Sequence, residues 1–194
     1  MIDWFVTFQF VAAFSDIQLV VVLPEDYIQE GKDLLAKNGF NKNIIFVAGG
    51  DTRFQSVKNG LGQVTASAIV FVHDAVRCLL TPALIQRCYQ QALEKGSAIP
   101  AVSSTDTVRL LKGDKNEVFD RKSVMLIQTP QTFQSDILLT AFNQAFEPSF
   151  TDEANVVEAS GKPIYLVDGE FENIKITRPL DLAIATHILA KRFA

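Results

Sequence analysis

Apolar residues gather in short continuous runs along the chain, and segments with apolar positions at helical spacing lie between these runs. The strongest run, from Ala68 to Val72, contains no polar residue. A run without polar alternation predicts a strand buried on both faces, as in a parallel sheet. Other runs predict strands at residues 18–23, 43–47, 98–102, 164–167 and 173–176.

Helices are expected between these strands, at residues 25–38, 53–61, 82–95, 134–146, 152–159 and 179–192. The best marked helix begins at Thr81 and Pro82 and ends before Gly96, which are favourable residues for the N-cap, the first helical position and the C-terminal turn. The first fourteen residues are apolar nearly all round, which favours a helix buried against a sheet. This alternation predicts an α/β fold with a doubly wound, mostly parallel sheet and right-handed crossovers.

Residues 103–128 depart from this pattern. Two short strand-like runs, 107–111 and 117–119, flank the turn-forming residues 113–116 and predict a β-hairpin arm. Nothing else in the sequence divides residues 1–194, so we expect one domain that carries the arm. An arm of this kind has little to pack on in its own chain, and exposed strand edges often pair with a second copy.

Composition and charge narrow the class of protein. The net charge is −4 and no basic stripe is present, which argues against a nucleic-acid binder. The apolar N-terminal segment contains Asp3, lacks basic residues and is too short to cross a bilayer, which argues against a signal peptide or a membrane anchor. Cys78 and Cys88 lack metal-ligand spacing and are expected to be reduced, half-buried packing residues of a cytoplasmic protein.

Candidate chemistry lies where the strongest strand ends, in the sequence His73-Asp74-Ala75-Val76-Arg77. Ligands of open α/β sheets bind beyond the carboxyl ends of the strands. Asp74 is therefore a candidate ligand for magnesium or a sugar hydroxyl, and Arg77 a candidate for bidentate phosphate binding. The alternative, a capping Asp74 paired with Arg77, is less favoured. His73 is interpreted as a structural histidine.

Two further segments are ambiguous on their own. The glycine turn before the helix at 53–61 would let a ligand approach the backbone, but a tight turn with Asp51 as N-cap is the simpler interpretation. Lys175 lies in an apolar run, where burial requires an anionic ligand or Asp74 as partner, although a solvent-facing lysine fits equally well. Arg178 resembles a helix-start residue. Arg121 of the arm could reach a neighbouring subunit, but an ordinary surface charge is favoured.

Five motifs nevertheless occur in one order: Gly49-Gly50-Asp51-x-Arg53-x-x-Ser56, His73-Asp74-Ala75-x-Arg77, Thr129-Pro130-Gln131-x-Phe133, Thr151-Asp152-Glu153-Ala154 and Asn173-Ile174-Lys175-Ile176-Thr177-Arg178-Pro179. In this order they resemble the 2-C-methyl-D-erythritol 4-phosphate cytidylyltransferase family over nearly the whole chain. The resemblance implies a Rossmann-like nucleotidyltransferase fold and a cytoplasmic enzyme of the non-mevalonate route to isoprenoids. The implied reaction is attack of a sugar-alcohol phosphate on the α-phosphorus of CTP, with release of pyrophosphate.

The resemblance also implies roles for individual positions. Those that match nucleotide contacts are Gly50, Asp51, Ser56 and Ala75; those that match contacts to the sugar-alcohol phosphate are Asp74, Arg77, Thr107, Thr129 and Thr151. Asp74 also matches the position at the metal, which would be Mg²⁺ or another divalent cation. Lys175 matches a lysine that orients the attacking phosphate, and Arg121 matches an arm residue contributed by the other subunit of a homodimer. No general base is required, because the attacking phosphate is already ionised.

The chain departs from the family at its start. The family has a strand, a glycine-rich loop and a Pro-Lys-Gln segment before the helix to which residues 1–4 correspond. We therefore expect an N-terminally incomplete domain with little or no activity. Cys78 stands where the family usually has proline, with a local effect expected. A ribitol 5-phosphate cytidylyltransferase and a non-catalytic nucleotide-binding fragment are the alternatives, although residues 151–154 and 177–179 favour the methylerythritol enzyme.

Overall fold

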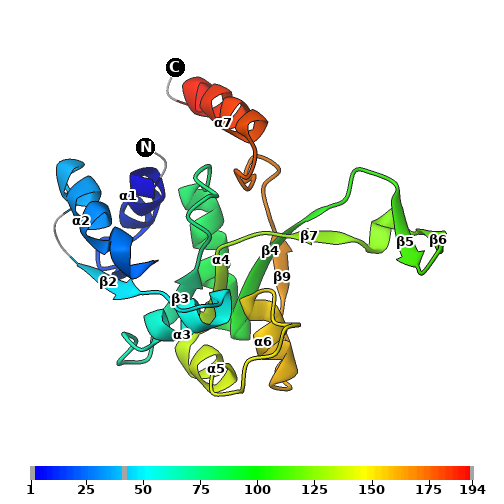
Figure 1. Cartoon of the computed structure of the whole chain (residues 1–194), viewed down its shortest axis with the longest axis horizontal. Helices are drawn as coiled ribbons and strands as arrows, with labels where there is room; N and C mark the ends of the chain where they lie inside the picture. Colours follow the sequence, from blue (N-terminus) through cyan, green and yellow to red (C-terminus); the bar gives the residue numbers. More distant parts are fainter. Residues whose placement is uncertain (1–2, 41–42, 193–194) are drawn as a thin grey trace.

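The protein is described by a computed structural model that covers residues 3–40 and 43–192. Its helices are α1 (Asp3–Ala13), α2 (Ile28–Lys37), α3 (Arg53–Leu61), α4 (Pro82–Lys95), α5 (Ser135–Ala141), α6 (Glu153–Ala159) and α7 (Pro179–Arg192). Its strands are β1 (Leu19–Leu23), β2 (Ile44–Ala48), β3 (Ile69–Val72), β4 (Ser97–Ser103), β5 (Val108–Lys112), β6 (Lys115–Phe119), β7 (Met125–Ile127), β8 (Gln131–Gln134) and β9 (Leu166–Asp168). Single 3-10 turns lie at Glu25–Tyr27 and Arg121–Ser123. The predicted α/β class is confirmed (Figure 1).

Two groups of paired strands make up the body of the molecule. β1 and β2 pair in parallel. In the larger sheet β8 lies between β3 and β4 and is antiparallel to both, β7 is antiparallel to β4, and β9 is parallel to β4. Within this larger sheet, the strands that the sequence predicted are β3, β4 and β9, and they run in one direction. The two strands that the sequence did not predict, β7 and β8, run antiparallel to them.

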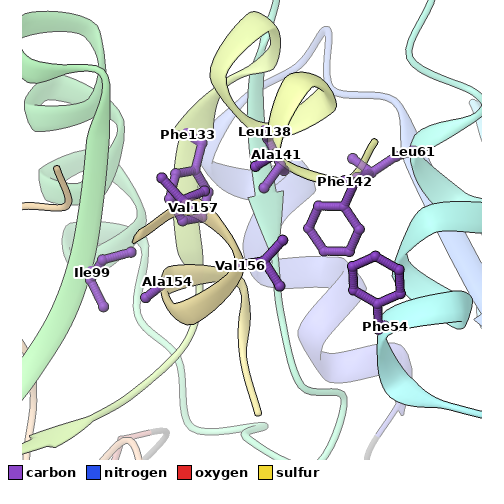
Figure 2. Packing of buried hydrophobic residues seen from close by; sticks show 10 residues of the cluster. All are labelled: Phe54, Leu61, Ile99, Phe133, Leu138, Ala141, Phe142, Ala154, Val156 and Val157. Carbon is purple, nitrogen blue, oxygen red and sulfur yellow. The ribbon is translucent and has the colours of Figure 1, made fainter. Parts of the chain in front are cut away.

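Helices cover both faces of this sheet. α1 and α4 contribute Phe10, Leu84 and Ile85 to a buried cluster that includes Phe71 of β3. Phe10 meets Phe71 edge-on at 5.5 Å between ring centroids, which confirms that the N-terminal helix packs against a sheet. α3, α5 and α6 build the cluster on the opposite face, shown in Figure 2. Alternate β3 side chains thus point into two different clusters, as a doubly wound sheet requires.

β3 is less buried than its sequence predicted. All four of its residues are partly exposed rather than buried on both faces. β3 is paired with β8 along one edge, and within residues 3–40 and 43–192 no ladder joins its other edge to β1. The continuous apolar run correctly predicted a strand with helices on both faces. Full burial of β3 would also require a neighbouring strand along each of its edges.

Other boundaries also differ from the sequence prediction. The segment 173–176 is a loop and not a strand, because its backbone is linked to the rest of the chain mainly by Ile176, whose N–H donates to Val76 O at 2.9 Å. The helix expected at 134–146 ends at Ala141, and β8 precedes it. Cys78 and Cys88 are reduced, but they are fully buried rather than half-buried.

The hairpin arm extends away from the body of the molecule (Figure 1). β5 and β6 form its antiparallel ladder, which confirms the predicted hairpin. Leu111 and Val118 lie on the same face of this ladder and are 81% and 63% exposed. Of the helices within the described ranges, none has the length and hydropathy needed to cross a bilayer.

Phe142 provides a test of the cluster in Figure 2, where its ring stacks on Phe54 with 4.8 Å between centroids. We expect Phe142→Ala to lower the free energy of unfolding by about 3 to 5 kcal/mol, because a large buried ring is replaced by a cavity. Urea denaturation measures this loss. Phe171→Ala is the matched control, since Phe171 is 64% exposed and should change stability little; equal losses in the two variants would contradict the proposed packing.

Candidate functional site

Asp74 is the centre of a cluster of charges directly after β3. The Lys175 Nζ lies 3.0 Å from Asp74 Oδ2, and the Arg77 Nε lies 3.8 Å from the same oxygen. The Arg53 Nη2 lies 3.4 Å from Asp74 Oδ1. Three basic side chains from distant parts of the chain therefore converge on one carboxylate. The expected partner of Lys175 is thus found in Asp74.

These neighbours determine the ionisation of Asp74. Burial by itself would raise the pKa of this carboxyl, but the hydrogen bond from Lys175 and the charges of Arg53, Lys175 and Arg77 outweigh burial. The pKa of Asp74 is consequently below its usual value. Asp74 is therefore an anion at neutral pH and available as a hard oxygen ligand.

Arg77 is held mainly by backbone carbonyls. Its Nη1 donates to Asn173 O at 2.9 Å and its Nη2 to Ile127 O at 3.4 Å. Its buried Nε has no hydrogen-bond partner among the described residues. Burial lowers the pKa of Arg77, and the charge of Asp74 opposes this. A buried donor without an acceptor is costly, so an anionic oxygen reaching Nε would be favourable.

Arg53 and the buried Glu153 form a partly exposed ion pair beside this cluster. Both carboxylate oxygens of Glu153 accept from Arg53, Oε1 from Nη1 and Oε2 from Nη2, the latter at 2.9 Å. Burial would lower the pKa of Arg53, but the hydrogen bond and charge of Glu153 raise it. Sequence reasoning assigned neither residue a role, although each lies in one of the five motifs. Each of the two residues belongs to a recognisable motif, but no sequence pattern indicates that these two motifs are in contact.

His73 and Thr129 fix the turn that carries Asp74. The Thr129 hydroxyl accepts from Asp74 N at 3.0 Å and donates to His73 Nδ1 at 2.9 Å. The opposite ring nitrogen, Nε2, then donates to Arg77 O at 3.2 Å. Burial lowers the pKa of His73 to about 4, so the ring is neutral at pH 7. Both nitrogens are used within the protein, which agrees with the interpretation of His73 as structural.

A cavity of about 180 Å³ contains this charge cluster. Its lining residues are Arg53, Asp74, Arg77, Ile127, Gln128, Thr129, Gln131, Thr151, Asp152 and Lys175. Five of the candidate residues from the sequence are among them, namely Asp74, Arg77, Thr129, Thr151 and Lys175. The candidate nucleotide contacts Gly50, Asp51, Ser56 and Ala75 are not part of this lining.

The glycine turn between β2 and α3 is closed by its own side chains. Gly50 N donates to Ser56 Oγ at 3.0 Å, and Ser56 Oγ donates to Thr52 O at 2.9 Å. The N-cap of α3 is Thr52, whose hydroxyl accepts from Gln55 N, so the expectation of Asp51 as N-cap was wrong. A Cβ at Gly50 would lie 2.2 Å from a Gln55 side-chain carbon, so a side chain there would displace Gln55.

Two candidate residues lie on the arm and outside the cavity lining of their own chain. Arg121 Nη1 donates to Thr105 O at 2.9 Å within the arm, and Thr107 is exposed. The single chain therefore does not bring Arg121 and Thr107 together with Lys175.

The donor set bears on metal binding. Within the described part of the chain, no group of three or more His, Cys, Asp or Glu side chains could hold a metal ion. Mg²⁺ commonly binds through one or two carboxylates together with substrate phosphates. Asp74 fits a Mg²⁺ ion that is bound in this way and would enter with a phosphate ligand.

Both the sequence and the fold of this chain are similar to those of known proteins. The family model of 2-C-methyl-D-erythritol 4-phosphate cytidylyltransferase matches residues 5–191. Proteins of that name from Bacteroides fragilis and Bacteroides thetaiotaomicron are 42% and 43% identical, over 89% of this chain and 78% and 79% of theirs. The crystal structure of the Thermus thermophilus protein of that name has a TM-score of 0.76 at 31% identity, covering 95% of this chain and 89% of that one. A 4-diphosphocytidyl-2C-methyl-D-erythritol synthase from Anaerococcus prevotii has a TM-score of 0.87 at 26% identity, with 97% and 86% covered.

The burial of His73 predicts a pH dependence of stability. Because the folded-state pKa is below the ordinary value of about 6.5, the unfolded chain binds a proton that the folded chain does not, and stability falls as pH drops from about 6.5 to about 4. This loss should amount to about 3 kcal/mol and be absent from His73→Gln. Urea denaturation at several pH values measures it. His187→Gln, at an exposed histidine of α7, should retain the wild-type dependence; a variant at His73 that also retains it would refute the assignment.

Proposed function

The chain belongs to the 2-C-methyl-D-erythritol 4-phosphate cytidylyltransferase family, and from this membership we propose how its residues carry out the reaction of the family. The enzyme transfers a cytidylyl group from CTP to 2-C-methyl-D-erythritol 4-phosphate in non-mevalonate isoprenoid biosynthesis, forming 4-diphosphocytidyl-2-C-methyl-D-erythritol and pyrophosphate. The relatives do not favour the ribitol phosphate alternative. The convergence of three basic side chains on Asp74 is the observation that carries the proposed site.

Two anions must meet in this reaction, so positioning and charge stabilisation are the main tasks of the protein. We propose that Lys175 orients the attacking phosphate. Its side chain is 47% exposed, and its ion pair with Asp74 can therefore be exchanged for a phosphate at small cost. The Nε of Arg77, which has no hydrogen-bond partner among the described residues, is a second donor for the same phosphate, with Thr107, Thr129 and Thr151 as further substrate contacts.

The nucleotide is proposed to bind on the side of the glycine turn. Gly50, Asp51 and Ser56 would contact the cytidine, and Ala75 would lie beside it, because the turn is exposed at Gly50 and Asp51 next to the N-terminus of α3. Asp74 would hold Mg²⁺ or another divalent cation that enters with CTP. Such a cation supplies positive charge at the triphosphate when bound.

Charge balance in the cavity bears on the rate. The basic lining residues Arg53, Arg77 and Lys175 are opposed by Asp74 and Asp152, and Glu153 neutralises Arg53 from behind. A triphosphate needs unbalanced positive charge for tight binding and for transition-state stabilisation. We therefore propose that these 194 residues by themselves turn over CTP slowly.

The arm is proposed to join two copies into a homodimer. Its exposed apolar side chains offer surface for a partner, and in such a dimer Arg121 and Thr107 would reach the other subunit's cavity. Arg121 would then stabilise negative charge in that cavity. A cytoplasmic location fits an enzyme with these soluble substrates and with two reduced cysteines.

Binding measurements test the role of Lys175. Lys175→Gln should weaken binding of methylerythritol phosphate by about 10-fold to 100-fold, because a charge-assisted contact is lost. Calorimetry measures this affinity, and a coupled pyrophosphate assay measures turnover, which we expect to be slow already in the wild type. Lys162→Gln, at an exposed lysine, is the control. Unchanged affinity in Lys175→Gln, or turnover of ribitol 5-phosphate in preference to methylerythritol phosphate, would contradict the proposal.

Sedimentation tests the dimer. The double substitution Leu111→Asp and Val118→Asp places two charges on one face of the arm and should convert a dimer into monomers. Leu182→Asp, at an exposed position of α7, is the control for added charge and should remain dimeric. A wild type that sediments as a monomer would refute the homodimer, and a dimeric arm variant would exclude this face as the interface.

A further inference from the structure

Glu153 is unusual among the buried side chains. Of the polar and charged residues that are buried in the described ranges, Glu153 alone carries an ionisable side chain, and it is 0% exposed. Burying a carboxylate costs free energy that a paired arginine offsets only in part, and a well-packed neutral residue often serves stability equally well. The stability of the fold is therefore not a sufficient reason for a carboxylate at this position.

The surroundings of Glu153 are rigid. It is the first residue of α6, whose N-cap residue Asp152 accepts from Asn155 N at 2.9 Å. The buried side chain of Gln131 donates to Asp152 Oδ2 and accepts from Ala154 N at 2.8 Å. The helix continues into the cluster of Figure 2. The backbone that carries the Glu153 carboxylate is thus held in place by the core.

Arg53 connects the Glu153 carboxylate to the cavity. Its Nη2 lies 2.9 Å from Glu153 Oε2 and 3.4 Å from Asp74 Oδ1, so one nitrogen faces both carboxylates. The shorter contact and the second hydrogen bond, from Nη1, are with Glu153. Arg53 is therefore held mainly by Glu153, and its contact with Asp74 is a single, longer one.

From this geometry we propose that Glu153 is a positioning residue that keeps Arg53 from forming a tight pair with Asp74. Within the described residues, Asp74 Oδ1 then has only this 3.4 Å contact and is left for a cation that enters with the nucleotide, while Oδ2 is shared by Lys175 and Arg77. This inference rests on the proposed role of Asp74. Without the charge of Glu153, the guanidinium would form its bidentate pair with Asp74, the nearest remaining carboxylate.

The test is a set of affinities for CTP, measured by calorimetry with and without Mg²⁺. Glu153→Gln should weaken binding of CTP about tenfold in the presence of Mg²⁺ and leave the Mg²⁺-free affinity unchanged, because Asp74 is withdrawn from the cation. In the double variant Arg53→Gln with Glu153→Gln, the ratio of the CTP affinities with and without Mg²⁺ should return to within about threefold of the wild-type ratio, because the competing cation is gone. Recovery by a second substitution is not expected of a residue that serves only to hold α6.

Controls separate this inference from the proposed function. Glu158→Gln makes the same chemical change at an exposed position of α6 and should bind as wild type does. Asp74→Asn should lose most of the Mg²⁺-dependent part of the affinity. If wild type shows no Mg²⁺-dependent binding, or Asp74→Asn retains it, the role of Asp74 and the inference both fail.

Failure of the inference alone has a different signature. Wild type and Asp74→Asn would behave as expected, but Glu153→Gln would bind normally or would lose affinity equally with and without Mg²⁺. A double variant whose Mg²⁺ dependence is as weak as that of Glu153→Gln would also overturn it, because Glu153 would not act through Arg53. Should Glu153→Gln fail to fold, the double variant still tests the inference, because loss of its Mg²⁺ dependence would overturn it.

Discussion

Attraction between one carboxylate and three cations holds the site together. Arg53, Arg77 and Lys175 come from α3, from the turn after β3 and from the loop before α7, and each approaches Asp74 to within 3.8 Å. Like charges at such spacing repel one another unless an anion lies between them. Asp74 therefore makes the convergence of these three segments possible, and a phosphate that binds here can take over part of that role.

Sequence patterns predicted those elements whose residues decide their structure locally. α4 has Thr81 and Gly96 at its ends, and both act as expected, since Thr81 caps the helix and Gly96 is left-handed with a φ of 89°. β8 and the loop at 173–176 were missed or misassigned, because partners elsewhere in the chain determine them. β8 is a strand because β3 and β4 offer their edges on both sides of it. The segment at 173–176 is a loop whose first residue, Asn173, donates from its side chain to Thr129 O.

The site divides in the same way. Asp74 and Arg77 were identifiable because they follow a strong strand, and Lys175 because a lysine in an apolar run needs a partner. The pair of Arg53 and Glu153 joins positions 100 residues apart, which neither spacing nor periodicity can reveal. Arg121 is a different case, since its proposed partner lies in a second copy of the chain, and neither the sequence nor the single chain can place it.

The cations around Asp74 differ in how readily they can move, and this difference suits the proposed chemistry. Lys175 is half exposed, and solvent replaces its ion pair at small cost when the amine turns to a phosphate. Arg53 is bound by a buried carboxylate that has no access to solvent, so its separation from Glu153 would leave an unpaired buried charge. A movable lysine and a fixed arginine on one carboxylate allow a substrate to exchange one ion pair without disturbing the helices that shape the cavity.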